Sequence, residues 1–271
     1  MTDTPKPLPA SAYQATRADT FLASALTRGP WHPDHQHAGP PVAMVCRALE
    51  RAALEHGLTH LCRLTANLLR PVPIGAVTIT VAADYVGRNA GHFSAQLIAL
   101  DKEVARFTAL LQREADVVLP GTLADPAMPL AFPGPDESKP ADFPFSGRHV
   151  GYADLVETRV AHGTFFGGPC AVWFRLRQGL LEGEAPSAYQ RVAVAADSGN
   201  GISAVLDFAK YSFVNSDLTI NLLRRPHGEW IGLDARTHLG PQGSGLAEST
   251  LYDAHGLIGR ATQSLMVRAR G

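Results

Sequence analysis

The sequence predicts an α+β protein in which one helix-and-sheet unit occurs twice. In each half, a segment with helical spacing of apolar residues is followed by four segments with strand-like alternation. Residues 64–70, LTANLLR, recur almost unchanged as residues 218–224, LTINLLR, and Arg106 in the first copy corresponds to Arg260 in the second. We therefore expect two related units that pack together, because each alone would expose an edge strand.

A central helix is predicted for residues 37–57 in the first half. Pro40 and Pro41 suit a first helical turn, where the backbone N–H groups have no partner within the helix. Gly57 is a typical residue at which a helix ends. The apolar stripe of this helix, spaced by three and four residues, comprises Val42, Val45, Cys46, Leu49 and Ala53.

Strands are predicted around this helix wherever β-branched and apolar residues alternate with polar ones. In the first half they cover residues 13–26, 63–69, 77–86, 92–100 and 104–113. A stretch rich in Pro, Ala, Gly and Asp then has no sustained period, which indicates a linker. The expected domains are therefore residues 13–114 and 150–271, joined by the linker 115–149.

The second half repeats this plan with a shorter helix. Ser187 and Gln190 have the spacing of a capping box, so a helix should begin there and end near Gly199. Strands are predicted at residues 152–162, 171–176, 213–223, 229–238, 245–252 and 257–268.

Composition excludes several classes of protein. The chain has 24 Lys and Arg against 25 Asp and Glu, a formal net charge of -1, and no basic block, so we expect no nucleic-acid partner. Its 3 cysteines lack a CxxC pair, so neither a disulfide framework nor a zinc knuckle is indicated. We find no signal-peptide pattern and no segment of membrane-spanning length, and therefore expect a cytoplasmic protein.

Three polar residues stand out. Two of them occupy positions that the repeat predicts to be in the core, and the third lies at a helix end that disfavours its charge. Ser216 and Gln263 lie on otherwise apolar strand faces, where the first copy has Cys62 and Ala109. A buried amide without partners is costly, so Gln263 should have internal partners. Asp197 ends the second helix, where the helix dipole disfavours negative charge and tends to raise the pKa. A carboxyl group with a raised pKa suits a general base.

Each of these residues also has a structural interpretation. Asp197 precedes Ser198 and Gly199 and could be a turn former, Ser216 could be a satisfied core hydroxyl, and Gln263 could be a structural hydrogen-bonding residue. Their joint occurrence in one copy favours a functional site between helix and sheet, and both interpretations stay open.

The loop before the first helix carries a group of potential metal ligands, His32, Asp34, His35 and His37. The loop contains Pro33, and no second group completes a ligand set, so no metal site is predicted.

The start of the first helix offers a different kind of site. Free N–H groups at a helix start can bind an anion or a developing oxyanion. Pro40 and Pro41 remove two donors, which leaves Gly39 and its neighbours, among them His37. Gly39 could instead serve only a tight turn.

Three segments carry a family resemblance: HAGPPVAMVCRALERA, LTINLLRRP followed by GEW, and GRATQSLMVR. Together with the repeat, they resemble the double-hotdog acyl-CoA thioesterases of the acyl-CoA thioesterase II type. The resemblance implies a tandem (double) hotdog fold, with two antiparallel sheets each wrapped around a central helix. It also implies an enzyme that hydrolyses acyl-CoA to free carboxylic acid and CoA.

The resemblance further implies site residues. The family places an Asp, a Ser or Thr, and a Gln in its C-terminal repeat to activate water, and by position these match Asp197, Ser216 and Gln263. Thr219 is an alternative hydroxyl, although strand alternation places it on the other face. The family also has glycines at the start of the first helix, where this chain has Ala38 before Gly39.

Two other functions stay open. A hotdog enoyl-CoA hydratase or dehydratase would need a histidine beside a carboxylate, for which His37 is the candidate. A non-catalytic acyl-ligand binding protein would need no such chemistry. We expect acyl-CoA as the partner and no cofactor, and the sequence leaves open the acyl type and whether the chain forms a homo-oligomer.

Overall fold

The protein is described by a computed structural model that covers residues 8–120, 130–144 and 149–270. The first half contains the strands β1 (Ser11–Ala15), β2 (Thr20–Ala23), β3 (His60–Leu68), β4 (Ala76–Val86), β5 (Ala90–Ala99) and β6 (Lys102–Gln112). The linker and second half contain β7 (Lys139–Ala141), β8 (Val156–His162), β9 (Cys170–Leu176), β10 (Gly179–Leu181), β11 (Tyr211–Asn215), β12 (Asp217–Leu222), β13 (Ile231–Leu239), β14 (Ser244–Asp253) and β15 (Gly256–Ala269). The helices are η1 (Ala25–Thr27), α1 (Gly39–Leu54), α2 (Tyr152–Leu155), α3 (Ala188–Ala196) and α4 (Gly199–Ser203).

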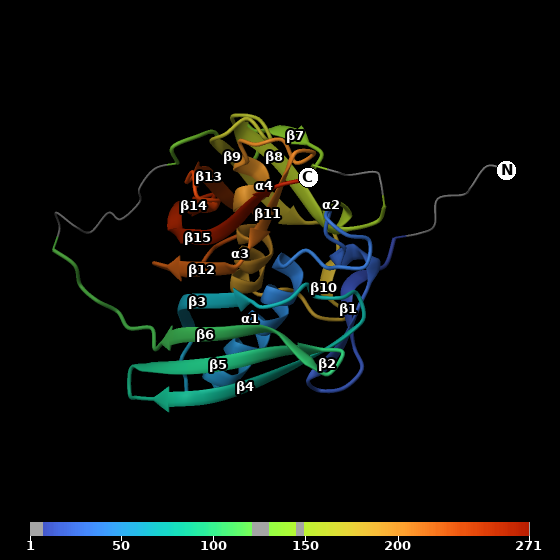
Figure 1. Cartoon of the computed structure of the whole chain (residues 1–271). Helices are drawn as coiled ribbons and strands as arrows, with labels where there is room; N and C mark the ends of the chain where they lie inside the picture. Colours follow the sequence, from blue (N-terminus) through green and yellow to red (C-terminus); the bar gives the residue numbers. More distant parts are fainter. Residues whose placement is uncertain (1–7, 121–129, 145–148, 271) are drawn as a thin grey trace.

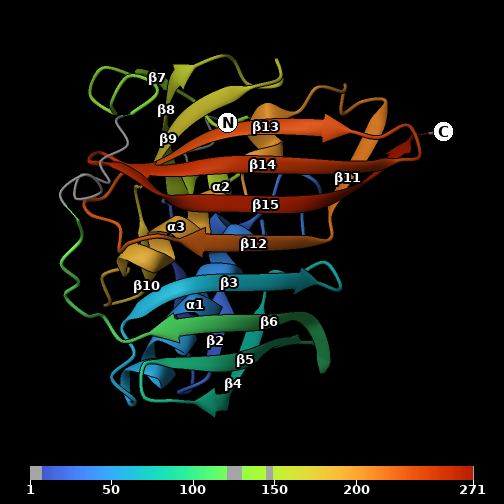
Figure 2. The same cartoon turned by 90° about the vertical axis from the view of Figure 1, so that its left-hand side faces the viewer.

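In the described ranges these strands form one continuous sheet. Figure 2 shows the sheet face-on, with the strands in front of the helices. Its order is β10-β1-β2-β4-β5-β6-β3-β12-β15-β14-β13-β9-β8-β7, and β11 also pairs with β15. The sheet is antiparallel except where β1 meets β10. The two antiparallel sheets expected for the two halves are joined here into one sheet. The edge strands β3 and β12 pair with each other and satisfy the backbone groups that each unit alone would expose.

β3 and β12 lie at the junction of the two halves and carry the repeated segments (Figure 1). Thr65 pairs with Thr219, and the Thr219 hydroxyl donates to Thr65 Oγ1 at 3.2 Å. β3 pairs on its other side with β6, and β12 pairs on its other side with β15. The register is the same in both pairs, because Thr65 lies opposite Thr108 and Thr219 lies opposite Thr262. The repeated segments therefore occupy corresponding positions, related by an approximate two-fold axis between Thr65 and Thr219.

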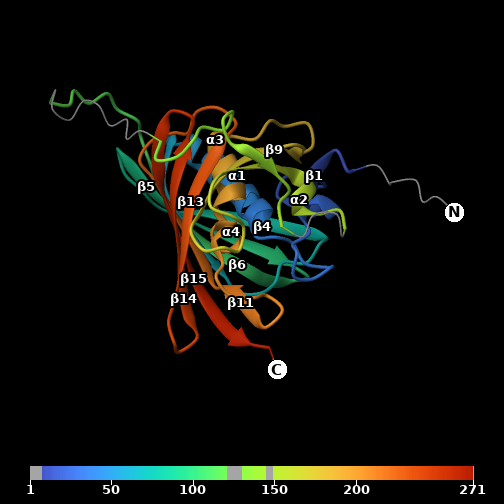
Figure 3. The same ribbon diagram turned by 90° about the horizontal axis from the view of Figure 1, so that it is seen from above.

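The helices α1 and α3 pack against each other on one side of the curved sheet, as the view in Figure 3 shows. The predicted capping box of α3 is confirmed: Gln190 N–H donates to Ser187 Oγ at 3.1 Å, and Ser187 N–H donates to Gln190 Oε1 at 2.8 Å. α1 has its prolines in the first turn and no side-chain cap. Among the described helices, none combines the length and apolar character needed to cross a membrane.

Two of the predicted strands differ in their boundaries near the start of each half. Residues 13–26 form two strands rather than one, because a turn closes where Thr16 N–H donates to the Thr20 carbonyl at 2.9 Å. α2 replaces the start of the strand predicted at residues 152–162, since Asp154 accepts a hydrogen bond from Gly151 N–H and starts a helical turn.

The linker is partly built into the fold. β7 extends the sheet beside β8, and the Trp173 indole N–H donates to the Pro133 carbonyl at 2.9 Å. Phe143 is buried in the core. Residues 121–129 and 145–148 of the predicted linker lie outside the described residues.

Candidate active site

The candidate site lies where the C-terminal end of α3 meets the N-terminal end of α1. Asp197 is the residue that follows α3, and its side chain is 5% exposed. Gly39 begins α1, and a Cβ at this position would overlap the carbonyl oxygen of Val194 in α3. Gly39 is therefore needed for the close approach of the two helices, and this approach brings the Asp197 carboxylate to the start of α1.

Hydrogen-bond donors surround the Asp197 carboxylate. Asn215 Nδ2 donates to Oδ1 at 3.3 Å, and Gln263 Nε2 donates to the same oxygen at 3.2 Å. Oδ2 lies 3.1 Å from His37 Nδ1. These partners come from β11, β15 and the loop before α1, so both halves of the chain contribute.

The pKa of Asp197 is raised, as predicted, but mainly for a different reason. Burial is the largest cause and raises the pKa, whereas His37, Asn215 and the backbone N–H groups of Gly39 and Ala38 lower it. The prediction assigned the shift to the dipole of α3. In the structure the carboxylate also faces the start of α1, whose N–H groups favour its ionised form.

His37 is held in a fixed orientation beside Asp197. Its ring stacks on Tyr152, with centroids 3.8 Å apart and an interplanar angle of 3°. The Tyr152 hydroxyl donates to the Val194 carbonyl at 2.8 Å, which ties this stack to α3. Gly39 N–H donates to His37 Nδ1 at 3.1 Å. Burial lowers the pKa of His37, and the charge of Asp197 raises it by a smaller amount, so the net direction is downward.

Gln263 has the internal partners that the sequence predicts. Its amide also donates to the Asp197 carbonyl at 3.0 Å, and its Oε1 accepts from Asn200 N–H at 3.0 Å. The side chain thus links β15 to the segment between α3 and α4. Gln263 does not line the cavity described below, so it contacts the carboxylate on the side that faces away from this cavity.

Ser216 is not brought to the site, and the prediction that it shares a buried strand face is wrong. The strand predicted across residues 213–223 is interrupted at Ser216, between β11 and β12, and the residue is exposed. The interruption changes the alternation, so Asn215 faces Asp197 instead. Thr219 is also absent from the site, since its hydroxyl contacts Thr65.

Other polar residues near the site were not predicted. Asn200 is buried beside Thr237, whose hydroxyl lies 2.8 Å from Ser203 Oγ. Asn200 belongs to a Ser-Gly-Asn-Gly stretch that resembles a turn, and no periodicity marks Asn215. Neither residue therefore carried a signal in the sequence.

The site opens into a cavity of about 320 Å³, called the main cavity here. Its polar wall is formed by His37, Asp197, Asn200 and Asn215. Its apolar wall includes Trp31, Leu68, Val72, Phe143, Phe166 and Phe213.

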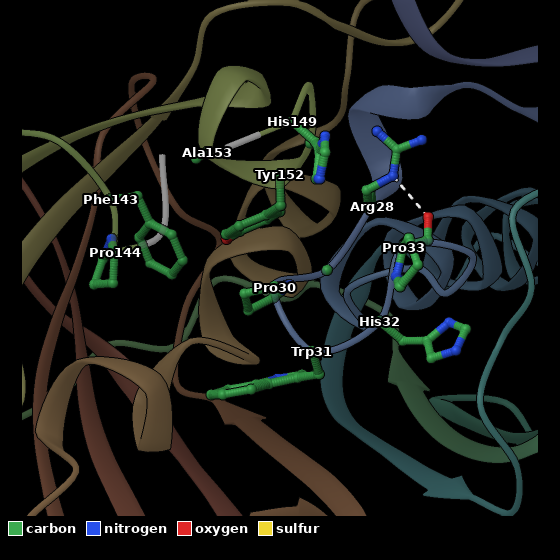
Figure 4. Close-up of a pocket in the computed structure, with 12 residues that line it drawn as sticks. Arg28, Pro30, Trp31, His32, Pro33, Phe143, Pro144, His149, Tyr152 and Ala153 are labelled. Atoms are coloured by element: carbon green, nitrogen blue, oxygen red, sulfur yellow. Dashed lines mark hydrogen bonds between the residues drawn. The ribbon is translucent and has the colours of Figure 1, made fainter. Parts of the chain in front are cut away.

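A second cavity of about 260 Å³, the side cavity, adjoins the main cavity. The two share Pro30, Trp31, Phe143 and Pro144 as lining residues. Figure 4 shows Phe143 on one side of the side cavity, Arg28 and His32 on the other, and Trp31 between them.

The histidine-rich loop does not assemble a metal-ligand set in the described part of the chain. His32 and His35 stack on each other with centroids 4.1 Å apart, and Asp34 N–H donates to His32 Nδ1. Across the described residues, no three His, Cys, Asp or Glu side chains converge in a way that could hold a metal ion.

Solved structures share this architecture. The acyl-CoA thioesterase II TesB2 of Mycobacterium marinum superposes with a TM-score of 0.68 at 16% identity, over 96% of this chain and 96% of that chain. A hotdog-fold protein of Alicyclobacillus acidocaldarius gives 0.71 at 16% identity, over 97% of each chain. The TesB protein of Mycobacterium avium subsp. paratuberculosis gives 0.67 at 17% identity, over 94% of this chain and 95% of that chain. The fold is therefore of the hotdog class.

Sequence profiles assign the family within this class. The acyl-CoA thioesterase N-terminal domain matches residues 27–112, and the acyl-CoA thioesterase C-terminal domain matches residues 135–267. A comparison with curated protein sequences gave no match. The chain belongs to the acyl-CoA thioesterase family and is a thioester hydrolase.

Proposed function

We propose that this protein hydrolyses acyl-CoA to a free carboxylic acid and CoA, using water that Asp197 activates. The observation that carries this proposal is a buried carboxylate, ringed by donors, at the wall of an otherwise largely apolar cavity. Such a cavity with a few convergent polar groups is typical of a small-molecule site. The raised pKa of Asp197 makes its carboxylate more basic than an exposed one.

The roles of the neighbouring residues follow from their contacts. Gln263 and Asn215 each donate to Asp197 Oδ1 and fix the carboxylate. The N–H groups of Ala38 and Gly39 lie at the start of α1, where the helix dipole stabilises negative charge. These N–H groups act on the Asp197 carboxylate and on His37 Nδ1, so we propose that one of these contacts opens when substrate binds and that the freed N–H stabilises the developing oxyanion of the thioester.

The acyl group would occupy the apolar part of the main cavity, beside Phe143, Phe166 and Phe213. The side cavity would then accommodate part of the CoA arm, because it adjoins the main cavity and carries Arg28 and His32.

We also propose that the two halves, residues 13–114 and 150–271, are the two units of a double hotdog. The common register around Thr65 and Thr219 supports this division. In this arrangement the site forms between units, because His37 and Gly39 come from the first and Asp197 and Gln263 from the second.

The test is a thiol-release assay on acyl-CoA substrates of several chain lengths, with aromatic acyl groups included. We expect thiol release with the purified protein and its loss in Asp197→Asn. A hydratase or dehydratase would instead change the absorbance of an enoyl-CoA without releasing thiol. An acyl-ligand binding protein would bind substrate and release nothing.

A further inference from the structure

The two nitrogens of the His37 ring have different surroundings. Gly39 N–H donates to Nδ1 at 3.1 Å, so Nδ1 carries a lone pair. A neutral imidazole has a single N–H, and its proton is therefore on Nε2. Burial lowers the pKa of His37, which favours this neutral form. The ring thus presents Nε2–H as a hydrogen-bond donor.

The Nε2–H group of His37 is open to the main cavity. The side chain is 8% exposed, and Nε2 has no hydrogen-bond partner among the described residues. In that part of the chain, the buried side-chain nitrogen and oxygen atoms without a partner are Arg63 Nε and Arg191 Nε. His37 Nε2 is therefore accessible, and His37 lines the main cavity and not the side cavity. A side chain that is more than nine-tenths buried thus offers an unused N–H to the space assigned to the thioester.

The position of this donor is fixed by the surrounding contacts. The His37 ring stacks on Tyr152, and Phe143 meets the ring edge-on at a centroid distance of 6.4 Å. The His37 backbone N–H donates to the Thr27 carbonyl at 2.7 Å. A donor that is in place before the substrate arrives needs no reorganisation when charge develops during the reaction. The ring is therefore suited to stabilising a negative charge in the cavity.

From this geometry we infer that His37 is a catalytic residue that donates its Nε2–H to the carbonyl oxygen of the thioester. Asp197 takes a proton from water while the water oxygen bonds to the carbonyl carbon, and the resulting oxyanion accepts the hydrogen bond from Nε2–H. When the C=O bond forms again, the C–S bond breaks and the proton on Asp197 passes to the leaving sulfur. The products are the carboxylic acid and the CoA thiol, and the ring keeps its own proton throughout.

The start of α1 sets up both the donor and the base. A neutral imidazole next to a helix N-terminus can polarise a substrate carbonyl, because the helix start lowers its pKa and disfavours the imidazolium. Here the Gly39 N–H binds the lone pair of His37 Nδ1, and the N–H groups of Gly39 and Ala38 also act on the Asp197 carboxylate. Nε2–H is free without the opening of any contact. It is therefore the first donor to the oxyanion, and a helix N–H released on substrate binding is the second.

This inference rests on the proposed function, but its central feature can be measured without substrate. NMR of ¹⁵N-labelled histidine reports which ring nitrogen carries the proton, and the His37 signals are identified by their loss in His37→Gln. Near neutral pH we expect Nε2 protonated and Nδ1 unprotonated. A proton on Nδ1, whether in the neutral ring or in the imidazolium, would overturn the inference.

Two substitutions separate a donor from a residue that only fills space. His37→Gln places an amide N–H near the position of Nε2, whereas His37→Leu has a comparable volume and no donor. In His37→Leu we expect kcat for acyl-CoA hydrolysis to fall by about 10²–10³, with little change in KM. His37→Gln should recover about tenfold of this loss, because the amide restores a donor.

The matched control is the same pair of substitutions at His60. This histidine lines neither cavity, and its Nδ1 lies 3.0 Å from the Tyr189 hydroxyl. Both His60 variants should keep the kcat of the wild type. A kcat within about threefold of wild type in His37→Leu would overturn the inference and leave thioester hydrolysis intact.

The polarisation of the carbonyl gives a second measurement, which a purely structural role of His37 would not change. The probe is the ketone analogue of the acyl-CoA that is hydrolysed fastest, with a CH₂ group in place of the thioester sulfur and ¹³C at the carbonyl. Infrared difference spectra should show a lower C=O stretching frequency for the analogue on the wild-type protein than in water. We expect this shift to be lost in His37→Leu and to return in part in His37→Gln.

A wild-type protein that binds the analogue without this shift would overturn the inference, and so would an equal shift in His37→Leu. Both results leave thioester hydrolysis intact. A wild-type protein that releases no thiol from any acyl-CoA would overturn the proposed function itself and the role of His37 with it.

Discussion

α1 and α3 meet at two junctions. At each junction a carboxyl group at one helix faces the start of the other, but the surroundings of the two carboxyl groups differ. At one junction, the end of α3 presents Asp197 to the start of α1. At the other, Glu50 of α1 faces the start of α3, where Ser187 Oγ donates to Glu50 Oε2 at 2.7 Å. Asp197 is buried and Glu50 is half-buried, and burial is the largest cause of a raised pKa at each.

The difference lies in how the two helix starts are capped. α3 has a complete capping box, so Ser187 and Gln190 use its first N–H groups. α1 begins after Ala38, which offers no side-chain cap, and the N–H groups there act on Asp197 and His37 instead. Glu50 has Cys46 Sγ as its other side-chain donor, and neither cavity reaches it. An uncapped helix start beside a cavity thus distinguishes the candidate site from its structural counterpart.

Removing the two carboxylates one at a time should give the largest contrast. We expect Asp197→Asn to lower kcat by about 10²–10⁴, because it removes the proton acceptor that activates water. Glu50→Gln keeps the shape at the other junction and should leave kcat unchanged. The assay is steady-state thiol release with both variants at matched substrate concentrations. Equal activities would show that the two junctions do not differ in function.

A change at each helix start should sharpen the comparison. The Cβ of Gly39→Ala would press on the Val194 carbonyl, so the helices must separate. We expect a loss of about 1–3 kcal/mol in the free energy of unfolding. We also expect kcat to fall by roughly tenfold or more, because separating the helices displaces the Asp197 carboxylate. At the capped junction, Ser187→Ala should cost about 0.5–2 kcal/mol and leave kcat unchanged. Denaturant titration and kinetics on both variants provide the measurement.

Gln263→Ala should affect both stability and activity. The first copy has Ala109 at the corresponding position, and by the repeat alone alanine would be expected to fit there. In the structure, however, the substitution leaves Asn200 N–H without its acceptor and frees one side of Asp197. We expect a loss of about 1–3 kcal/mol in the free energy of unfolding and a lower kcat. A variant with wild-type kcat would mean that Asn215 alone holds the carboxylate.

The repeat allowed most of the fold to be predicted, because both copies bury the same faces. Gln263 was identified as a buried residue with partners for the same reason: its counterpart is apolar. Ser216 was misplaced because its prediction assumed an uninterrupted strand. The corresponding residue of the first copy, Cys62, lies at an irregularity of β3, between Leu61 and Arg63. A shared interruption cannot be recognised from alternation alone.

His37 shows a second limit of the sequence. Its position before a helix suggested a substrate contact, and its contact with Asp197 depends on how two distant helices pack. Gly39 carries the information for that packing, but a glycine at a helix start is equally typical of a turn. Asn215 and Asn200 were missed because single polar residues beside turns carry no periodic signal.

The pH dependence of kcat should reflect the Asp197–His37 pair. Catalysis by Asp197 as the base requires this carboxylate to be ionised. The pKa of Asp197 is raised above its ordinary 3.8, and that of His37 is lowered below its ordinary 6.5. Activity should therefore fall as pH decreases through the raised pKa of Asp197, at a pH above its ordinary value, and be retained above it. Glu50→Gln should not move this acidic limb, whereas a limb shifted by Glu50→Gln would show that the two junctions are coupled.

The smallest effect is expected at Ser216. Its side chain is exposed, and its contacts are those of the backbone: Ser216 N–H donates to the Ser264 carbonyl at 2.9 Å, and its carbonyl accepts from Leu68 N–H at 2.9 Å. Ser216→Ala keeps both bonds and should change the free energy of unfolding by less than about 0.5 kcal/mol, with kcat unchanged. Asn215→Ala, one residue earlier, removes a donor to Asp197 and should lower kcat several-fold. Measuring both variants in one thiol-release assay decides which residue serves the site. A loss of activity in Ser216→Ala with none in Asn215→Ala would restore the hydroxyl that the family resemblance implied and would require Ser216 to reach the substrate by a rearrangement of the strand interruption.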